Sequence, residues 1–241
     1  MDKNRINFLY VFPNLFTAAS IFLGIVSIIN ATVGNYEKAA WLIALATIFD
    51  ALDGRVARIT HTTSKFGGEF DSLADVIAFG VAPALLLYFS YAADFGRFGI
   101  TVVALYAIFG AVRLARFNVM SSDTDPNVFI GLPIPASALL VITWILIFNE
   151  YPVLQEYSLI LVILGFCSSI LMVSNVRYPS FKKIDFSRAN FVKGLIVLIV
   201  TLSTIFIYPV EALCAIITIY ALYGVVRYFY TIITRLASKE R

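Results

Sequence analysis

Long apolar segments recur from one end of this chain to the other, and they limit its fold more than any other feature. A helix that spans a bilayer needs about 20 mainly apolar residues. Cutting the chain at its polar, Pro and Gly positions leaves eight segments of about this size: residues 13–33, 38–58, 70–91, 98–117, 132–148, 158–176, 191–208 and 209–230. Because 60% of the residues are hydrophobic and 14% are charged, we predict an all-α polytopic membrane protein, a bundle of about eight transmembrane helices.

The positions of the cations predict how these helices are oriented. Short cytoplasmic loops retain Lys and Arg. If the N-terminus is cytoplasmic, all 18 Lys and Arg residues fall on the cytoplasmic side except Lys38 and Arg97. We therefore predict cytoplasmic N- and C-termini and a multi-pass protein of the cell membrane. The cations are dispersed between the apolar segments and form no single basic face, so we expect no nucleic-acid partner.

The chain shows no internal repeat and no low-complexity tract that would divide it into separate units. We therefore expect residues 1–241 to form a single transmembrane domain. Its polar residues of interest are concentrated in one stretch, residues 50–75, which joins the second and third predicted helices.

Four aspartates in this stretch interrupt the apolar pattern near the cytoplasmic helix ends. Asp50 and Asp53 are three residues apart and Asp71 and Asp75 are four apart, so each pair lies on one face of its helix. An aspartate at the bilayer midplane costs about 2.5 to 3.5 kcal/mol, but Asp50 is recessed only about 12 Å from the charged helix end at Arg58. Because the two helices run in opposite directions, we expect the four carboxylates to meet in the inner leaflet, facing the cytosol.

Carboxylates held this close together repel one another unless cations compensate their charge. Oxygen ligands favour hard ions, and the stretch offers no cysteine and no histidine except His61 in the loop, so we predict Mg2+ or Mn2+ and exclude zinc and iron–sulfur chemistry. Two such ions about 3.5 to 4 Å apart, bridged by a shared carboxylate, suit the displacement of a phosphoryl group. The cluster therefore indicates phosphate chemistry.

Small and polar residues accompany the aspartates. Gly54 lies inside a predicted helix, where glycine is disfavoured by about 1 kcal/mol relative to alanine, and Ala57 follows one turn later. Both leave room for a substrate group against the backbone, while Arg58 can meet a phosphate. Ser64 and Gly67 offer hydroxyl and backbone donors near the N-terminus of the next helix, which favours an anion.

Five further polar residues are candidates for substrate contacts, and four of them have a second interpretation. Arg113 and Arg116 either bind the acceptor or a lipid phosphate, or anchor the fourth predicted helix at the cytoplasmic surface. Lys65, in the loop before the third helix, has the same ambiguity. Asn118 can add a hydrogen bond to a substrate. Asn14, inside the first helix, either faces a nucleotide or bonds to a neighbouring helix.

Residues 50–75 follow the pattern D-x2-D-G-x2-A-R-x8-G-x3-D-x3-D. This pattern resembles, at every fixed position, the signature of the CDP-alcohol phosphatidyltransferases. Within that family the chain looks most like the CDP-diacylglycerol–serine O-phosphatidyltransferases, through the stretches PNLFTAAS at 13–20, RLARFN at 113–118 and GLPIPA at 131–136. The resemblance implies transfer of the phosphatidyl group from CDP-diacylglycerol to the hydroxyl of L-serine with release of CMP, by two-metal catalysis.

The same resemblance implies roles for individual residues. Asp50, Asp53 and Asp71 would be metal ligands, and Asp75 would be both a ligand of the second metal ion and the general base. The residues that would bind CDP-diacylglycerol are Gly54, Ala57, Arg58, Ser64 and Gly67, with Asn14 as a further candidate. Candidates for binding the serine carboxylate or the lipid phosphate are Lys65, Arg113, Arg116 and Asn118. The resemblance also suggests a homodimer surrounded by membrane lipids.

Two alternatives stay open at this point. The same chemistry could use another acceptor, such as glycerol phosphate or inositol phosphate, or an archaeal ether-lipid substrate. A divalent-cation transporter is an alternative of a different class. Transport, however, predicts acidic residues along a path through both leaflets, and the outer halves of the predicted helices lack them.

Overall fold

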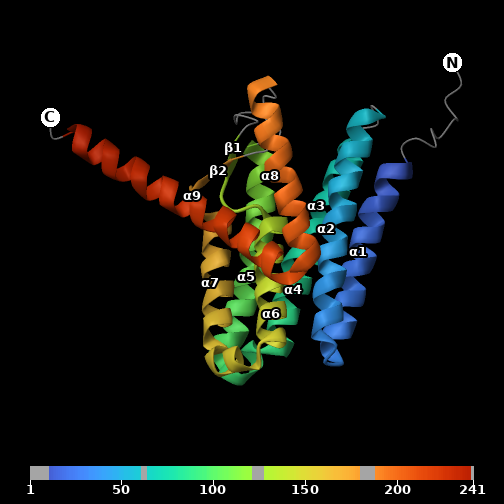
Figure 1. The fold of residues 1–241 in the computed structure, drawn as a ribbon. Helices are drawn as coiled ribbons and strands as arrows, with labels where there is room; N and C mark the ends of the chain where they lie inside the picture. Colours follow the sequence, from blue (N-terminus) through green and yellow to red (C-terminus); the bar gives the residue numbers. More distant parts are fainter. Residues whose placement is uncertain (1–10, 61–63, 121–127, 180–187, 240–241) are drawn as a thin grey trace, which may run out of the picture.

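The protein is a bundle of helices with one short two-stranded ribbon (Figure 1). The computed structural model describes residues 11–60, 64–120, 128–179 and 188–239. Its elements are α1 (Val11–Thr32), α2 (Tyr36–Ile59), α3 (Lys65–Asp75), η2 (Val76–Val81), α4 (Ala82–Ser90), η3 (Ala92–Phe95), α5 (Gly96–Met120), β1 (Val128–Ile130), α6 (Ile134–Glu150), η4 (Pro152–Tyr157), α7 (Leu159–Val173), β2 (Arg177–Pro179), α8 (Arg188–Ile207) and α9 (Pro209–Lys239).

Every apolar segment cut from the sequence falls on a helix, so the prediction of an all-α membrane fold is confirmed. Among the described residues, 4 helical stretches can cross a membrane by length and composition: Asn14–Thr32, Lys65–Ser90, Ala92–Met120 and Pro209–Thr234. Shorter apolar helices cover Ile134–Glu150, Leu159–Val173 and Gly194–Ile207. Helix α2 has 24 residues, and it carries the first aspartate pair and two arginines in its C-terminal half.

The third helical stretch begins earlier than the expected start at residue 70. Ser64 stands at its N-cap, where its Oγ accepts a hydrogen bond from the Gly67 N–H at 2.9 Å. This cap satisfies one of the free N–H groups of the first turn, so the helix begins at Lys65. After Asp75 the stretch passes through the π-helical segment η2 and continues as α4. A π-helical turn inside a helix is rare and is frequently found at functional sites.

Helices α1 and α2 pack as an antiparallel pair through small residues (Figure 1). The buried face of α1 repeats every three or four residues and consists of Thr17, Ser20, Gly24, Ser27, Asn30 and Ala31. A Cβ on Gly24 would lie 3.0 Å from the Ala78 Cα, so α1 also approaches η2 closely. Small residues allow such close helix approach in membrane proteins. The packing fixes α1 beside the helices that carry the four aspartates.

The ribbon of β1 and β2 holds α9 against the bundle. Phe129 of β1 pairs with Tyr178 of β2 in an antiparallel register. The Tyr178 side chain is fully buried, and its hydroxyl donates to the Ala221 carbonyl of α9 at 3.2 Å. A Cβ on Gly224 would lie 2.2 Å from the Tyr178 ring, so glycine is required at this crossing. These contacts tie α9 to β2, the strand that follows α7.

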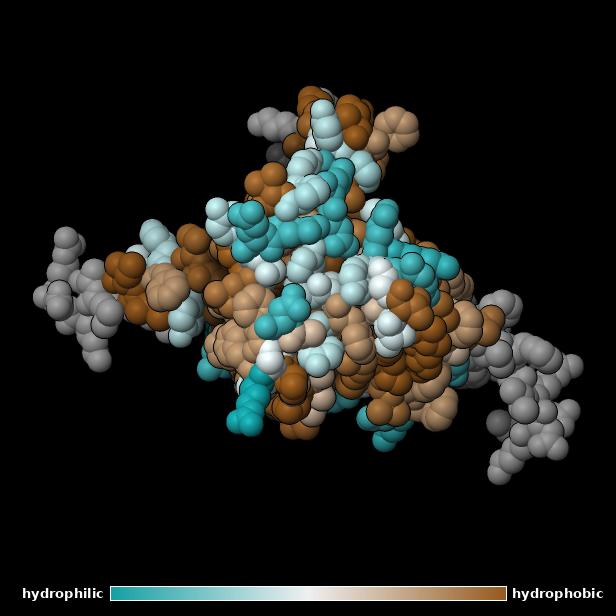
Figure 2. All heavy atoms as spheres, turned by 90° about the horizontal axis from the view of Figure 1, so that it is seen from below, coloured by the Kyte–Doolittle hydropathy of each residue, from teal (hydrophilic) through white to brown (hydrophobic). Residues whose placement is uncertain are grey.

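The outer surface suits a lipid environment. Large apolar side chains such as Phe22, Ile48 and Phe206 are 66%, 57% and 90% exposed. Viewed from below, hydrophilic residues gather across the end of the bundle, with hydrophobic residues on either side of them (Figure 2). Exposed apolar surface of this extent is rare on soluble monomers, and it agrees with the membrane fold.

Candidate active site

The aspartates of α2 and α3 come together in space. Carboxylate oxygens of Asp50, Asp53 and Asp71 all lie within 4.8 Å of one another. The Asp50 carboxylate is also within hydrogen-bonding reach of both Asp71 and Asp75. The two pairs of aspartates therefore converge in the structure, as their spacing predicted. The individual roles of ligand and base stay predictions.

The cluster fits a divalent cation. Asp71 Oδ1 and Asp75 Oδ1 are buried and have no hydrogen-bond partner among the described residues. A buried carboxylate oxygen left unpaired is costly, and a cation held between the helices would remove that cost. All of the clustered donor atoms are carboxylate oxygens, which hard ions such as Mg2+ and Mn2+ prefer. The donor set does not distinguish between these two ions.

Thr17 of α1 joins the cluster, although the sequence singled out no role for it. Its Oγ1 donates a hydrogen bond to Asp53 Oδ2 at 2.8 Å, and both residues are buried, at 3% and 5% exposure. The bond fixes one oxygen of the Asp53 carboxylate and leaves the other for a ligand. The sequence did contain a signal for this contact, a hydroxyl inside an apolar helix. The sequence does not reveal its partner, however, because Asp53 lies 36 residues away in the chain.

The residues proposed for CDP-diacylglycerol binding fall into two groups. Asn14, Ser64 and Gly67 lie together where α3 begins, because a Cβ on Gly67 would be 3.1 Å from Ser64 Oγ and 3.5 Å from Asn14 Oδ1. In the other group, a Cβ on Gly54 would meet nothing within 4 Å. The Arg58 Nε donates to the Gly54 carbonyl at 2.8 Å. The backbone at Gly54 therefore faces open space in which a substrate group can lie.

Ala57 precedes Arg58 on α2 and is half-buried. Lys65 is the first residue of α3 and its side chain is exposed. The Asn118 Nδ2 donates to Ser72 Oγ at 2.9 Å, which ties the end of α5 to α3. Substrate contacts of all three residues stay predictions.

The two arginines of α5 have different surroundings. Arg113 is 6% exposed, interacts electrostatically with Asp75, and its Nε has no hydrogen-bond partner among the described residues. Arg116 donates to the Val173 carbonyl at 3.2 Å and to Asn175 Oδ1 at 2.7 Å. Arg113 therefore belongs to the aspartate cluster, whereas Arg116 holds the chain at the end of α7.

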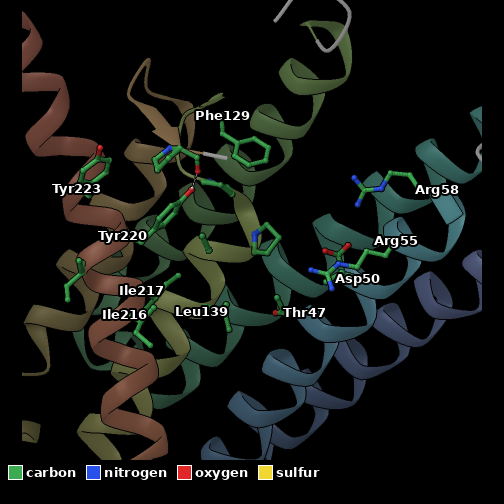
Figure 3. A pocket seen from close by; sticks show the side chains of 16 residues that line it. Thr47, Asp50, Arg55, Arg58, Phe129, Leu139, Ile216, Ile217, Tyr220 and Tyr223 are labelled. Carbon is green, nitrogen blue, oxygen red and sulfur yellow. Dashed lines mark hydrogen bonds between the residues drawn. The ribbon is translucent and has the colours of Figure 1, made fainter. Parts of the chain in front are cut away.

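A cavity of about 1180 Å3 opens beside the cluster, between α2 on one side and α6, the ribbon and α9 on the other (Figure 3). Its polar end carries Asp50, Arg55 and Arg58 of α2. Its opposite wall is apolar and includes Leu139, Ile216 and Ile217. Arg55 occupies an unspecified position of the motif, so sequence reasoning passed over it. The cavity joins a charged end to an apolar wall, as a lipid with a phosphorylated headgroup requires.

The sequence profile described as CDP-alcohol phosphatidyltransferase matches residues 10–174. The chain belongs to this family. The matched region includes the four aspartates, the glycines and Arg58, so the family signature coincides with the cluster and the polar end of the cavity.

Several relatives are similar over most of their length. A CDP-diacylglycerol–serine O-phosphatidyltransferase of Helicobacter pylori is 48% identical over 241 residues, which cover 98% of both chains. A protein of the same description from Methanocaldococcus jannaschii is 35% identical over 87% of this chain and 93% of its own. An archaetidylserine synthase of Methanothermobacter thermautotrophicus is 37% identical over 74% of each chain.

Proposed function

We propose that this chain transfers the phosphatidyl group of CDP-diacylglycerol to the hydroxyl of L-serine, giving phosphatidylserine and CMP. One observation carries the proposal: relatives described as serine O-phosphatidyltransferases are similar over 98% of the chain, and the similarity includes the whole aspartate cluster. The cation-transporter alternative has no comparable support. Neither the cavity beside the cluster nor the arginines in it has an evident purpose in permeation.

The metal ligands in this proposal are Asp50, Asp53, Asp71 and Asp75. When bound, Mg2+ or Mn2+ would neutralise the pyrophosphate and stabilise the departing CMP. Thr17 holds the Asp53 carboxylate in place from α1. Two ions are proposed because four carboxylates supply enough oxygen ligands for both, with one carboxylate shared between the two ions.

Asp75 is proposed as the general base. It would accept the proton of the serine hydroxyl while that oxygen attacks the phosphorus bearing diacylglycerol, and the bond from this phosphorus to the CMP oxygen would break. A carboxylate is a weak base for an alcohol, so proton transfer must accompany attack. Arg113 lies near Asp75, where its cation can receive the carboxylate of serine. That contact would hold the acceptor with its hydroxyl toward the base.

The cavity suggests how the lipid substrate is held. Arg55 and Arg58 at the polar end are suited to the pyrophosphate, and the apolar wall with Leu139 and Ile217 is suited to acyl chains. The CMP part of the substrate would lie toward Asn14, Ser64 and Gly67, where the N-terminus of α3 favours its phosphate. Gly54 leaves the intervening backbone accessible.

The topology belongs to the same proposal. We infer eight spans, cytosolic chain ends, and an active site that faces the cytosol in the cell membrane, as a single domain over residues 1–241. Support comes from the distribution of cations and from the apolar helices. We also propose a homodimer, on the family resemblance.

An acceptor panel tests the function. Purified protein receives CDP-diacylglycerol, Mg2+ or Mn2+, and either L-serine, glycerol phosphate or inositol phosphate, and CMP release is measured. We expect release with serine and little with the phosphorylated acceptors, which would require more cationic contacts. CMP release with another alcohol and not with serine would refute the assigned acceptor. A parallel reaction with an ether-linked CDP lipid tests the substrate class suggested by the archaetidylserine synthase relative.

A further inference from the structure

A second, smaller cavity lies further along α9, toward the C-terminal end of this helix. Its volume is about 330 Å3, and its lining residues are Asn175, Arg177, Arg227, Tyr228, Thr231 and Ile232. It shares no lining residue with the catalytic cavity. The lining contains two arginines and no acidic residue, so its charge is strongly positive. Neither arginine belongs to the motif of residues 50–75.

Backbone geometry explains why the two arginines meet. On β2, Arg177 is exposed and directly precedes Tyr178, whose buried side chain contacts α9 at Gly224. On α9, Arg227 and Thr231 are four residues apart and lie on one face of the helix. Strand β2 is seated on α9 by the Tyr178 hydroxyl bond to Ala221. Two cations from distant parts of the sequence are thereby held at one cavity.

A neutral donor completes the set. The Asn175 Oδ1 accepts a hydrogen bond from Arg116 at 2.7 Å, which turns the amide so that its Nδ2 group is the part available to a ligand. Arg177 and Arg227 add planar guanidinium groups, which bind phosphate oxygens in pairs. An arginine that merely anchors a helix at the membrane surface needs no such partners. The arrangement fits a phosphate group.

The surroundings favour a lipid as the source of that phosphate. Large apolar side chains on another face of the same stretch of α9 are exposed: Val226 at 65%, Phe229 at 58% and Ile233 at 63%. Strand β2 lies at the same end of the bundle as the C-terminal end of α2, with Arg55 and Arg58 (Figure 1). Basic pockets at this membrane face bind anionic headgroups, and the exposed side chains offer contacts for acyl chains.

We propose that Arg177 and Arg227 bind the phosphate group of an anionic phospholipid, at a site separate from the catalytic cavity. The lipid phosphate bridges β2 and α9, and it reinforces the contact through which the ribbon holds the wall of the catalytic cavity.

Lipid counting by native mass spectrometry tests this site. The full-length protein in detergent is titrated with phosphatidylglycerol, with phosphatidylcholine, or with inorganic phosphate. We expect the wild type to retain one more phosphatidylglycerol than the Arg177→Gln/Arg227→Gln variant, with an affinity for that lipid at least about ten-fold higher. Phosphatidylcholine, which has no net charge, should show no such difference.

The matched control is Lys38→Gln/Arg97→Gln, which removes the same charge at the predicted outer face. The control should bind phosphatidylglycerol like the wild type, and both double variants should keep their CMP release. If the Arg177/Arg227 variant retains the extra lipid, or the control loses it equally, the site is refuted. If inorganic phosphate displaces phosphatidylglycerol at millimolar concentration, a soluble phosphate compound is the ligand and the lipid assignment is overturned. The single variants Arg177→Gln and Arg227→Gln, each with a partial loss, give the same answer if the double variant does not fold.

Discussion

The two ends of the catalytic cavity are built in different ways. The polar end takes its charged groups from α2, and it adjoins the aspartates of α3, which follows α2 in the chain, and one hydroxyl of α1. The apolar wall takes Leu139 from α6 and Ile216 and Ile217 from α9, which lie far from the motif in the sequence. The chemistry is thus encoded within one short stretch, whereas the lipid-binding wall depends on the complete bundle.

The two ends of the cavity also differ in how they affect the stability of the fold. The aspartate cluster beside the polar end contains buried carboxylate oxygens that have no hydrogen-bond partner among the described residues, and these weaken the fold until a cation binds. The apolar wall contributes side chains that pack favourably whether or not substrate is present. Substitutions at the polar end should therefore change turnover and metal dependence, and substitutions in the wall should change the apparent affinity for the lipid.

Removing the proposed base should have the largest effect. Asp75→Asn keeps the size of the side chain and removes its capacity to accept the serine proton, so CMP release should fall by about 100- to 10,000-fold. The matched control is Glu69→Gln, an exposed acid on the same helix, which should keep nearly full turnover. Near-normal turnover of Asp75→Asn, at normal folding by circular dichroism, would exclude Asp75 as the base.

Removing the hydroxyl that holds Asp53 should have a smaller effect. Thr17→Val loses a hydrogen bond to a charged group, worth about 1.5 to 3 kcal/mol, and should raise the Mg2+ or Mn2+ concentration for half-maximal activity by about ten-fold or more. Turnover at saturating metal should recover substantially. Thr17→Ser retains the hydroxyl and should restore the metal dependence of the wild type. A defect that saturating metal does not relieve would contradict this positioning role.

Shortening a side chain of the apolar wall should have the smallest effect. Ile217→Ala removes methyl and methylene groups worth about 0.8 kcal/mol each when fully buried. Because Ile217 also packs against the protein core, a lipid chain covers only part of it, and KM for long-chain CDP-diacylglycerol should rise a few-fold. KM for a short-chain substrate and the metal dependence should change less. Ile233→Ala, an exposed position on the same helix outside the cavity, is the control. Equal changes for both chain lengths would remove the distinction between the two ends.

The sequence predicted the polar end far better than the apolar wall. Apolar segment lengths predicted the helices, and the spacing of Asp50, Asp53, Asp71 and Asp75 predicted their convergence, because both depend on local periodicity. Thr17 and the contact of Arg116 with Asn175 depend on which helices become neighbours. Spacing within one helix carries no information on that. The cavity wall was missed for the same reason, since Ile216 and Ile217 resemble any other apolar residues of a spanning helix.

The boundary of the third helix shows how a single contact can override hydropathy. The apolar run predicted a start at Phe70, but the hydroxyl of Ser64 caps a turn that begins at Lys65. Hydropathy reports where a helix enters the hydrocarbon, and a helix continues into the interface as long as its N–H groups find partners.

The π-helical segment η2 separates two tasks along one helix. Before it, α3 directs Asp71 and Asp75 toward α2; within it, Ala78 meets Gly24 of α1 at close range. A π turn holds one residue more than the α-helical turn that would replace it. It therefore sets the angle about the helix axis between the face with Asp71 and Asp75 and the face with Ala78. Deleting one residue from Val76–Val81 should leave a regular helix of nearly the same length, yet rotate the acids away from their partners whenever α1 remains docked. The helix therefore tolerates a change of composition at this point more readily than a change of length.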